Sequence, residues 1–203
     1  LRDRSIILVK WQGLLDNART MWVGKHGAEQ IVKQIHAQTH PVRLDLPGRK
    51  MGWNSRPFFT FIGKDAVDAL VEYFERERGW PKPKEPLWPK KILNNKKDQA
   101  LTYMGFDRMW MRQIRKINLV PKQPGTGATT RYGYNPHEMR DIAKSLLHTK
   151  ALADGFDLSC CEFWLGHIVD PLGYDKFYHD QEYVRKQYLI AEKYLNIISG
   201  TEA

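Results

Sequence analysis

Two imidazoles, a guanidinium and a phenol follow one another along the last third of the chain. His137 and Arg140 are three residues apart, a spacing that puts both on one face of a helix. His167 follows in a Leu-Gly-His tripeptide, and Tyr174 and Tyr178 come after it. Attack on a phosphodiester without a metal needs fixed positive charge, a proton acceptor and a nucleophile. These residue types supply all three.

Local signals predict the elements that carry these groups. Asn135 suits an N-cap, Pro136 suits the first helical position and Glu138 suits a capping carboxylate, so a helix is expected to begin here. A second helical stretch follows, and the Leu-Gly-His tripeptide is expected to end it sharply. Asp170-Pro171 then starts a short segment that carries the two tyrosines.

The order His-x-x-Arg, Leu-Gly-His and tyrosine resembles the C-terminal catalytic domain of tyrosine recombinases, the phage-type and archaeal-type integrases. Each motif alone is common, but their joint order is much more specific. The match is strong from Asn135 to the chain end and weaker from Asn17 to Tyr73. The resemblance implies DNA strand cleavage and rejoining through a 3′-phosphotyrosyl intermediate. It also implies double-stranded DNA as partner, self-association as a tetramer on DNA, and no cofactor or metal.

The resemblance assigns a role to each group. Arg140 would hold the nonbridging phosphate oxygens, His167 would donate a hydrogen bond to the phosphate, and His137 would help to accept the tyrosine proton. Tyr174 lies two positions before the family's usual tyrosine and Tyr178 two positions after it. We favour Tyr174 as nucleophile, because it follows the predicted helix start by one turn. Tyr178 remains the alternative.

One position departs from the family pattern. Gly24 and Glu29 fit the family's Gly-x-Arg-x-x-Glu, but His26 takes the place of the arginine. Arginine is always charged and donates two hydrogen bonds to a phosphate, whereas histidine is mostly neutral at pH 7. Losing such a donor costs on the order of 3 kcal/mol, about a hundredfold in rate, so activity is expected to be reduced. Arg19 could replace it, or His26 could be a surface turn residue.

A β-hairpin is predicted in the first half, with strands over 42–46 and 57–62 and a turn over 47–54. Family members carry a lysine on such a turn, which reaches the minor groove and protonates the leaving oxygen. Lys50 is the candidate for this role, with Arg49 beside it as a DNA contact. A solvated basic turn is the alternative for both.

The remaining elements predict a mainly α-helical fold with a small antiparallel β-sheet, an α+β class. Hydrophobic periodicity predicts helices over 5–20, 30–38, 65–79, 101–118 and 181–198. Among their side chains, Ile117 and Ile198 are expected to face inward and Arg78 outward. A proline- and lysine-rich connector over 80–91 cannot be helical, and we interpret it as a surface loop within one catalytic domain, 1–203.

Composition favours a polyanionic partner. The formal net charge is +9, with 32 Lys and Arg against 23 Asp and Glu, which favours nucleic acid through counterion release. Lys122 and Arg131 lie in a Gly- and Thr-rich loop, 121–134, that could follow a DNA backbone. Such a basic charge also occurs in proteins that bind no nucleic acid.

The two cysteines, Cys160 and Cys161, are adjacent, which suits no ordinary disulfide. An intracellular, cytoplasmic location follows, nucleoid-associated when bound, and no apolar run is long enough to span a membrane. The sequence starts at Leu1 without a signal-peptide pattern, so we expect a piece excised from a larger protein.

Two other functions remain open. A recombinase-like module that has lost catalysis, suggested by His26, would bind DNA in a salt-sensitive way without a covalent adduct. A type IB topoisomerase-like enzyme shares the chemistry, but it would relax supercoils without a defined site.

Overall fold

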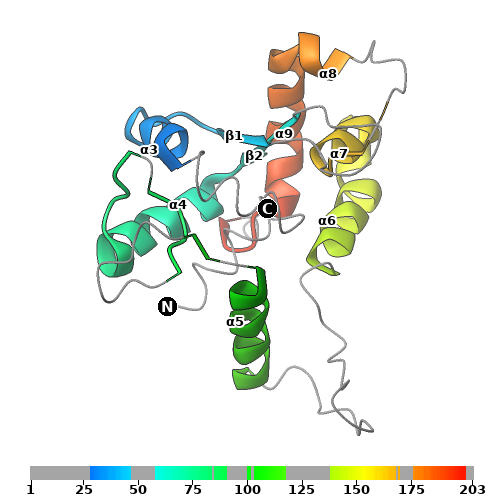
Figure 1. The fold of residues 1–203 in the computed structure, drawn as a ribbon. Helices are drawn as coiled ribbons and strands as arrows, with labels where there is room; N and C mark the ends of the chain where they lie inside the picture. The colour runs from blue at the N-terminus through cyan, green and yellow to red at the C-terminus, as the bar shows by residue number, and fades with distance from the viewer. Residues whose placement is uncertain are drawn as a thin grey trace, which may run out of the picture.

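The computed structural model describes residues 28–46, 58–83, 85–90, 100–101, 103–117, 138–167, 169 and 176–199. Figure 1 shows the arrangement of the elements. In chain order they are α3 (Ala28–His36), β1 (Val42–Leu46), β2 (Phe58–Ile62), α4 (Lys64–Tyr73), the π-helical turn η2 (Phe74–Arg78), α5 (Tyr103–Lys116), α6 (Glu138–Thr149), the 3-10 turn η3 (Ala151–Asp154), α7 (Leu158–Trp164), α8 (Lys176–His179) and α9 (Gln181–Leu195). The fold is therefore mainly helical with one small antiparallel sheet, as predicted.

The predicted hairpin is confirmed. β1 and β2 pair antiparallel, with Val42 opposite Ile62 and Leu46 opposite Phe58. Burial alternates along β1, whereas every residue of β2 is buried, because rings of α7 and α9 pack against it. One covering helix is α7, whose Phe163 meets the Phe59 ring edge-on at 5.2 Å between centroids. The sheet thus lies in the core beside α7, the helix that precedes His167.

The predicted helix over 65–79 is confirmed as α4 and η2, but its last turn differs from expectation. Arg78 was predicted to face solvent and is only 1 % exposed, so that prediction is wrong. Its guanidinium donates to the carbonyl oxygen of Pro86 at 2.5 Å and pairs with Glu85 at 3.3 Å. The cause is the π-helical turn, whose wider winding rotates later residues away from the α-helical phase.

Arg78 links the connector to the core, because it binds Pro86 and Glu85. Leu87 and Trp88 of the connector are buried in the main hydrophobic cluster, and Pro89 forms an isolated bridge with Ala100. The described part of the connector contains no helix, in keeping with its prolines. The single-domain organisation of residues 1–203 stays a prediction.

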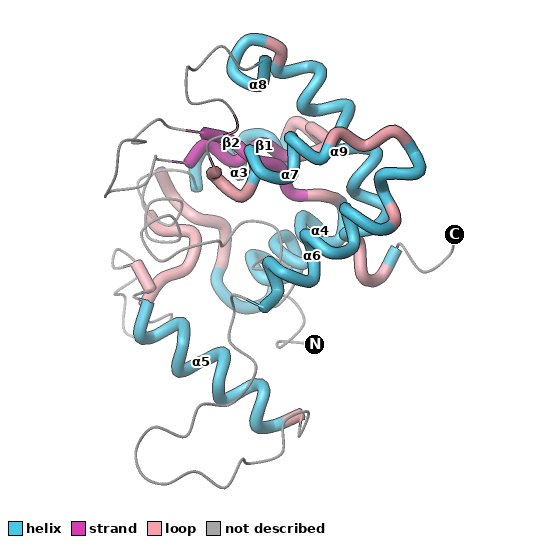
Figure 2. Tube along the Cα trace, turned by 90° about the vertical axis from the view of Figure 1, so that its right-hand side faces the viewer, coloured by secondary structure: helices cyan, strands magenta, loops and turns pink. Residues whose placement is uncertain are grey.

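Helix α5 projects from the other helices in two views that differ by 90° (Figures 1 and 2). Its buried residues Phe106 and Trp110 form a small cluster of their own, against which Met139 of α6 packs. Ile117 was expected to face inward, but it is 50 % exposed because it lies just past the last helical residue.

The last helix packs on the protein's own core. Val184, Tyr188, Ala191 and Leu195 of α9 are buried, as the predicted stripe requires. Ile198 is an exception at 53 % exposure, because α9 ends before it. None of the helices among the described residues combines the length and apolar character needed to cross a bilayer.

Candidate functional site

The structure describes three of the predicted site residues: Arg140, His167 and Tyr178. It brings Arg140 and His167 into direct contact. The other predicted catalytic and DNA-binding residues lie outside the described residues: His26, Arg49, Lys50, Lys122, Arg131, His137 and Tyr174. Their roles stay predictions.

His167 is positioned by the end of α7. Leu165 is the C-cap, and Gly166 follows in the left-handed conformation with φ 70°. The N–H of Gly166 donates to the Phe163 carbonyl at 2.8 Å, and the N–H of His167 donates to the Glu162 carbonyl at 2.9 Å. This pair of bonds is a Schellman motif, which favours glycine at the left-handed position. The predicted sharp stop is confirmed, and it places His167 beside Glu162.

Both ring nitrogens of His167 are engaged. Nδ1 contacts the Glu162 carboxylate, and Nε2 contacts Nη2 of Arg140. A guanidinium has donors and no acceptor, so Nε2 must accept the hydrogen bond from Arg140. The ring proton of neutral His167 therefore lies on Nδ1 and is donated to Glu162.

Arg140 and His167 differ in exposure. Arg140 lies in the first turn of α6 and is 8 % exposed, because α6 packs against α7 and α9. The His167 side chain is 35 % exposed, so an incoming ligand reaches the pair from the His167 side. A largely buried guanidinium is fixed in place, which suits recognition of an anion without further ordering.

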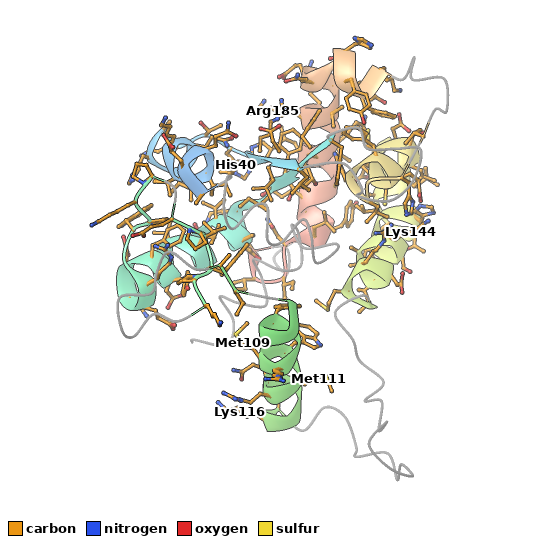
Figure 3. All side chains as sticks on the ribbon, viewed as in Figure 1. His40, Met109, Met111, Lys116, Lys144 and Arg185 are labelled. Atoms are coloured by element: carbon orange, nitrogen blue, oxygen red, sulfur yellow. The ribbon has the colours of Figure 1, made fainter. Side chains whose placement is uncertain are left out.

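Lys144 and Glu162 form a cluster with Arg140 and His167. Neither of these two residues was identified from the sequence. Lys144 follows Arg140 by one helical turn, where Figure 3 shows it on α6, and its Nζ lies 2.5 Å from Oε1 of Glu162. Partial burial works to raise the pKa of Glu162, but hydrogen bonds from Lys144 and His167 outweigh it and lower that pKa. The bond to Glu162 raises the pKa of Lys144. The cluster thus holds two fixed cations, one carboxylate and one imidazole.

A cavity of about 40 Å³ is lined in part by Arg140. It has room for ordered water, whereas sites for small-molecule cofactors usually exceed about 300 Å³. The buried Nε1 of Trp164, which lines it, has no hydrogen-bond partner among the described atoms and is a donor for such a water. The cavity is lined by Thr60, Phe61, Arg140, Ala143, Lys144, Leu147, Cys161, Trp164, Leu165, Tyr188 and Leu195.

Tyr178, the alternative nucleophile, lies in α8, next to the start of α9 (Figure 1). Its ring meets Phe163 edge-on at 5.2 Å between centroids, and its neighbour Phe177 stacks on the same ring at 5.2 Å. Phe163 follows Glu162 in α7, so α8 is anchored to the helix that carries the site. The choice between Tyr174 and Tyr178 stays open.

Comparisons of the chain with protein-family models, with curated proteins and with solved structures found no match. Within the part of the chain that the structure describes, no three His, Cys, Asp or Glu side chains gather as ligands for a metal ion. The cluster combines donors on Arg140 and Lys144 with an imidazole, groups whose chemistry suits the binding of an oxyanion.

Proposed function

We propose that this chain is the catalytic domain of a tyrosine recombinase, which cleaves and rejoins double-stranded DNA at a defined site. One observation carries the proposal: Arg140 and His167, 27 residues apart in the sequence, are in side-chain contact. These are the two described residues to which the sequence motifs assign phosphate binding.

The reaction follows from the properties of these groups. A phosphodiester repels nucleophiles by its negative charge, so the Arg140 guanidinium and a donor on His167 would neutralise the charge on the nonbridging oxygens. The tyrosine oxygen attacks the phosphorus and its proton passes to a base, for which His137 is the candidate. A 3′-phosphotyrosyl bond forms as the bond from phosphorus to the 5′-oxygen breaks, and that oxygen leaves as a hydroxyl with a proton from an acid, for which Lys50 is the candidate. Reversal on another strand completes recombination without ATP.

Charge supports DNA as the partner. The chain carries a formal net charge of +9. Among the described residues of the cluster, Arg140 and Lys144 supply two positive charges against one carboxylate, Glu162, which favours the approach of a phosphate. The proposal includes self-association as a tetramer on DNA and a cytoplasmic, nucleoid-associated location.

A library of nicked duplexes with randomised sequence tests the proposal without knowledge of the target site. The nick lets the short 5′-hydroxyl strand diffuse away, so a covalent protein–DNA adduct accumulates. We expect an adduct that resists detergent, with the DNA joined to a peptide containing Tyr174 or Tyr178 in mass spectra. Salt-sensitive binding without adduct would favour the catalytically impaired module. Relaxation of supercoils without sequence preference would favour the topoisomerase-like enzyme.

A further inference from the structure

We infer that Glu162 is a positioning residue for His167, which it holds with the proton on Nδ1 and with Nε2 directed to the phosphate site beside Arg140. The inference rests on the proposed function for the identity of the phosphate. The orientation of the ring itself depends only on contacts within the chain.

Glu162 holds His167 at two points. Its carbonyl oxygen accepts the backbone N–H of His167 at 2.9 Å, and its carboxylate accepts Nδ1–H. The backbone hydrogen bond fixes the position of the His167 main chain, and the side-chain hydrogen bond fixes which edge of the imidazole faces α6. A carboxylate on the far nitrogen of a working histidine is a general means of setting its tautomer.

Lys144 holds the carboxylate in turn. Its Nζ binds Oε1 at 2.5 Å, and Oε2 is the oxygen that contacts His167. The Glu162 side chain is 29 % exposed, so without the bond to Lys144 water would compete with His167 for hydrogen bonds to its two oxygens. With both oxygens engaged, the carboxylate keeps one orientation.

This arrangement explains how His167 becomes a donor. In the observed tautomer Nε2 is an acceptor occupied by Arg140, so it cannot donate to phosphate. When a phosphate draws the Arg140 donor to its own oxygens, Nε2 becomes free to take a proton from solvent. The ring then donates on both sides, to phosphate and to Glu162.

The second proton would enter a positive environment. Arg140 and Lys144 from α6 both oppose it, and Glu162 from α7 is the carboxylate that the structure places against the ring. Glu162 therefore has two effects: it sets the tautomer before the phosphate binds and stabilises the imidazolium afterwards.

Ring nitrogen NMR tests the first effect without any DNA. Long-range ¹H–¹⁵N spectra of histidine-labelled protein distinguish the two neutral tautomers, and the spectrum of His167→Gln assigns the signal. Because Arg140 also keeps Nε2 as an acceptor, the effect of Glu162 is measured in an Arg140→Met background. We expect the Nδ1–H form in the wild type and in Arg140→Met, and a mixture of both forms in Arg140→Met/Glu162→Met. Glu182→Met is the matched control, because this exposed α9 residue pairs only at the surface, 3.6 Å from Arg185. A wild-type proton on Nε2, or an unchanged tautomer in Arg140→Met/Glu162→Met, would overturn the inference.

Adduct formation on the randomised nicked duplexes tests the second effect. We expect Glu162→Met to slow it about 10–100-fold, the usual effect of losing a residue that orients a catalytic group. Glu182→Met should form adduct at the wild-type rate, and an equal loss in both variants would contradict a specific role for Glu162.

The two measurements separate failure of the inference from failure of the proposed function. If the wild type forms adduct and Glu162→Met forms it equally fast, the positioning role is wrong and the recombinase proposal stands. If the ring is held as expected but the wild type forms no adduct, the recombinase proposal is wrong and the orienting contact stands.

Discussion

The main chain of His167 and its imidazole both bind to the same residue, Glu162, five positions earlier in the sequence. The backbone N–H donates to the Glu162 carbonyl at 2.9 Å, and Nδ1 contacts the Glu162 carboxylate. One helix-ending motif therefore sets both the location and the orientation of the ring. The geometry of the candidate site depends on the left-handed residue that makes this motif possible.

Gly166→Ala tests that dependence. Gly166 has φ 70°, a conformation that costs a residue with a Cβ about 1–2 kcal/mol, so the free energy of unfolding should fall by that amount in urea titrations. Gly155→Ala is the matched control, since Gly155 has φ 80° and nothing within 4 Å of an added Cβ. Both variants should lose similar stability, but only Gly166→Ala should shift the His167 ring signals. Equal ring spectra in the two variants would contradict the account.

Gly63→Ala should destabilise the junction between α4 and α9. An added Cβ would lie 2.4 Å from Oε1 of Glu192, which caps α4 by accepting the Lys64 N–H at 2.7 Å and also binds His40. Displacing this buried carboxylate should cost about 0.5–2 kcal/mol, the usual effect of losing a cap. Urea unfolding measures the loss. In a Glu192→Ala background the same substitution should cost much less, and an undiminished cost would refute the proposed clash.

Asp157 predicts a pH dependence of stability. Burial works to raise its pKa, but bonds from Lys176, Tyr183 and Ser159 outweigh it and lower the pKa to about 2, from an ordinary value of 3.8. The stabilisation, about 2 kcal/mol, is present above pH 3.8 and is lost as the pH falls toward 2. The difference in unfolding free energy between wild type and Asp157→Asn should therefore shrink over that interval. A difference that stays constant from pH 7 to pH 2 would disprove the lowered pKa.

Two arginines two positions apart should differ sharply in their importance for stability. Arg78→Met leaves the buried Pro86 carbonyl without its donor and should lower the unfolding free energy by about 1–3 kcal/mol. Arg76 pairs with Glu72 on the surface, so Arg76→Met should change it by less than about 0.5 kcal/mol. Thermal or urea unfolding of both variants measures the contrast. Equal effects would mean that the connector is not held by Arg78.

Local patterns in the sequence predicted the elements of the fold well. Alternation in β1 located the hairpin, and Gly166 located the end of α7. Patterns based on the α-helical period failed at Arg78, because no local signal announced the π-helical turn that buries it. Ile117 and Ile198 failed because the helices end earlier than the periodicity suggests.

The site was predictable only in part. The motif order brought Arg140 and His167 together as candidates before any coordinates. Lys144 could have been found, since it follows Arg140 at a spacing that shares a helix face. Glu162 could not be recognised from spacing alone, because its role requires both the Schellman motif and the packing of α6 on α7.

The most direct test of the phosphate site is the yield of covalent DNA adduct from Arg140→Ala relative to the wild type. The matched control is Arg76→Ala, which removes a surface guanidinium of the same charge. Both proteins are incubated with the randomised nicked duplexes at one salt concentration, after urea unfolding has established that both are folded. We expect Arg76→Ala to keep the wild-type yield and Arg140→Ala to lose about a hundredfold or more. A wild-type yield from folded Arg140→Ala would contradict it.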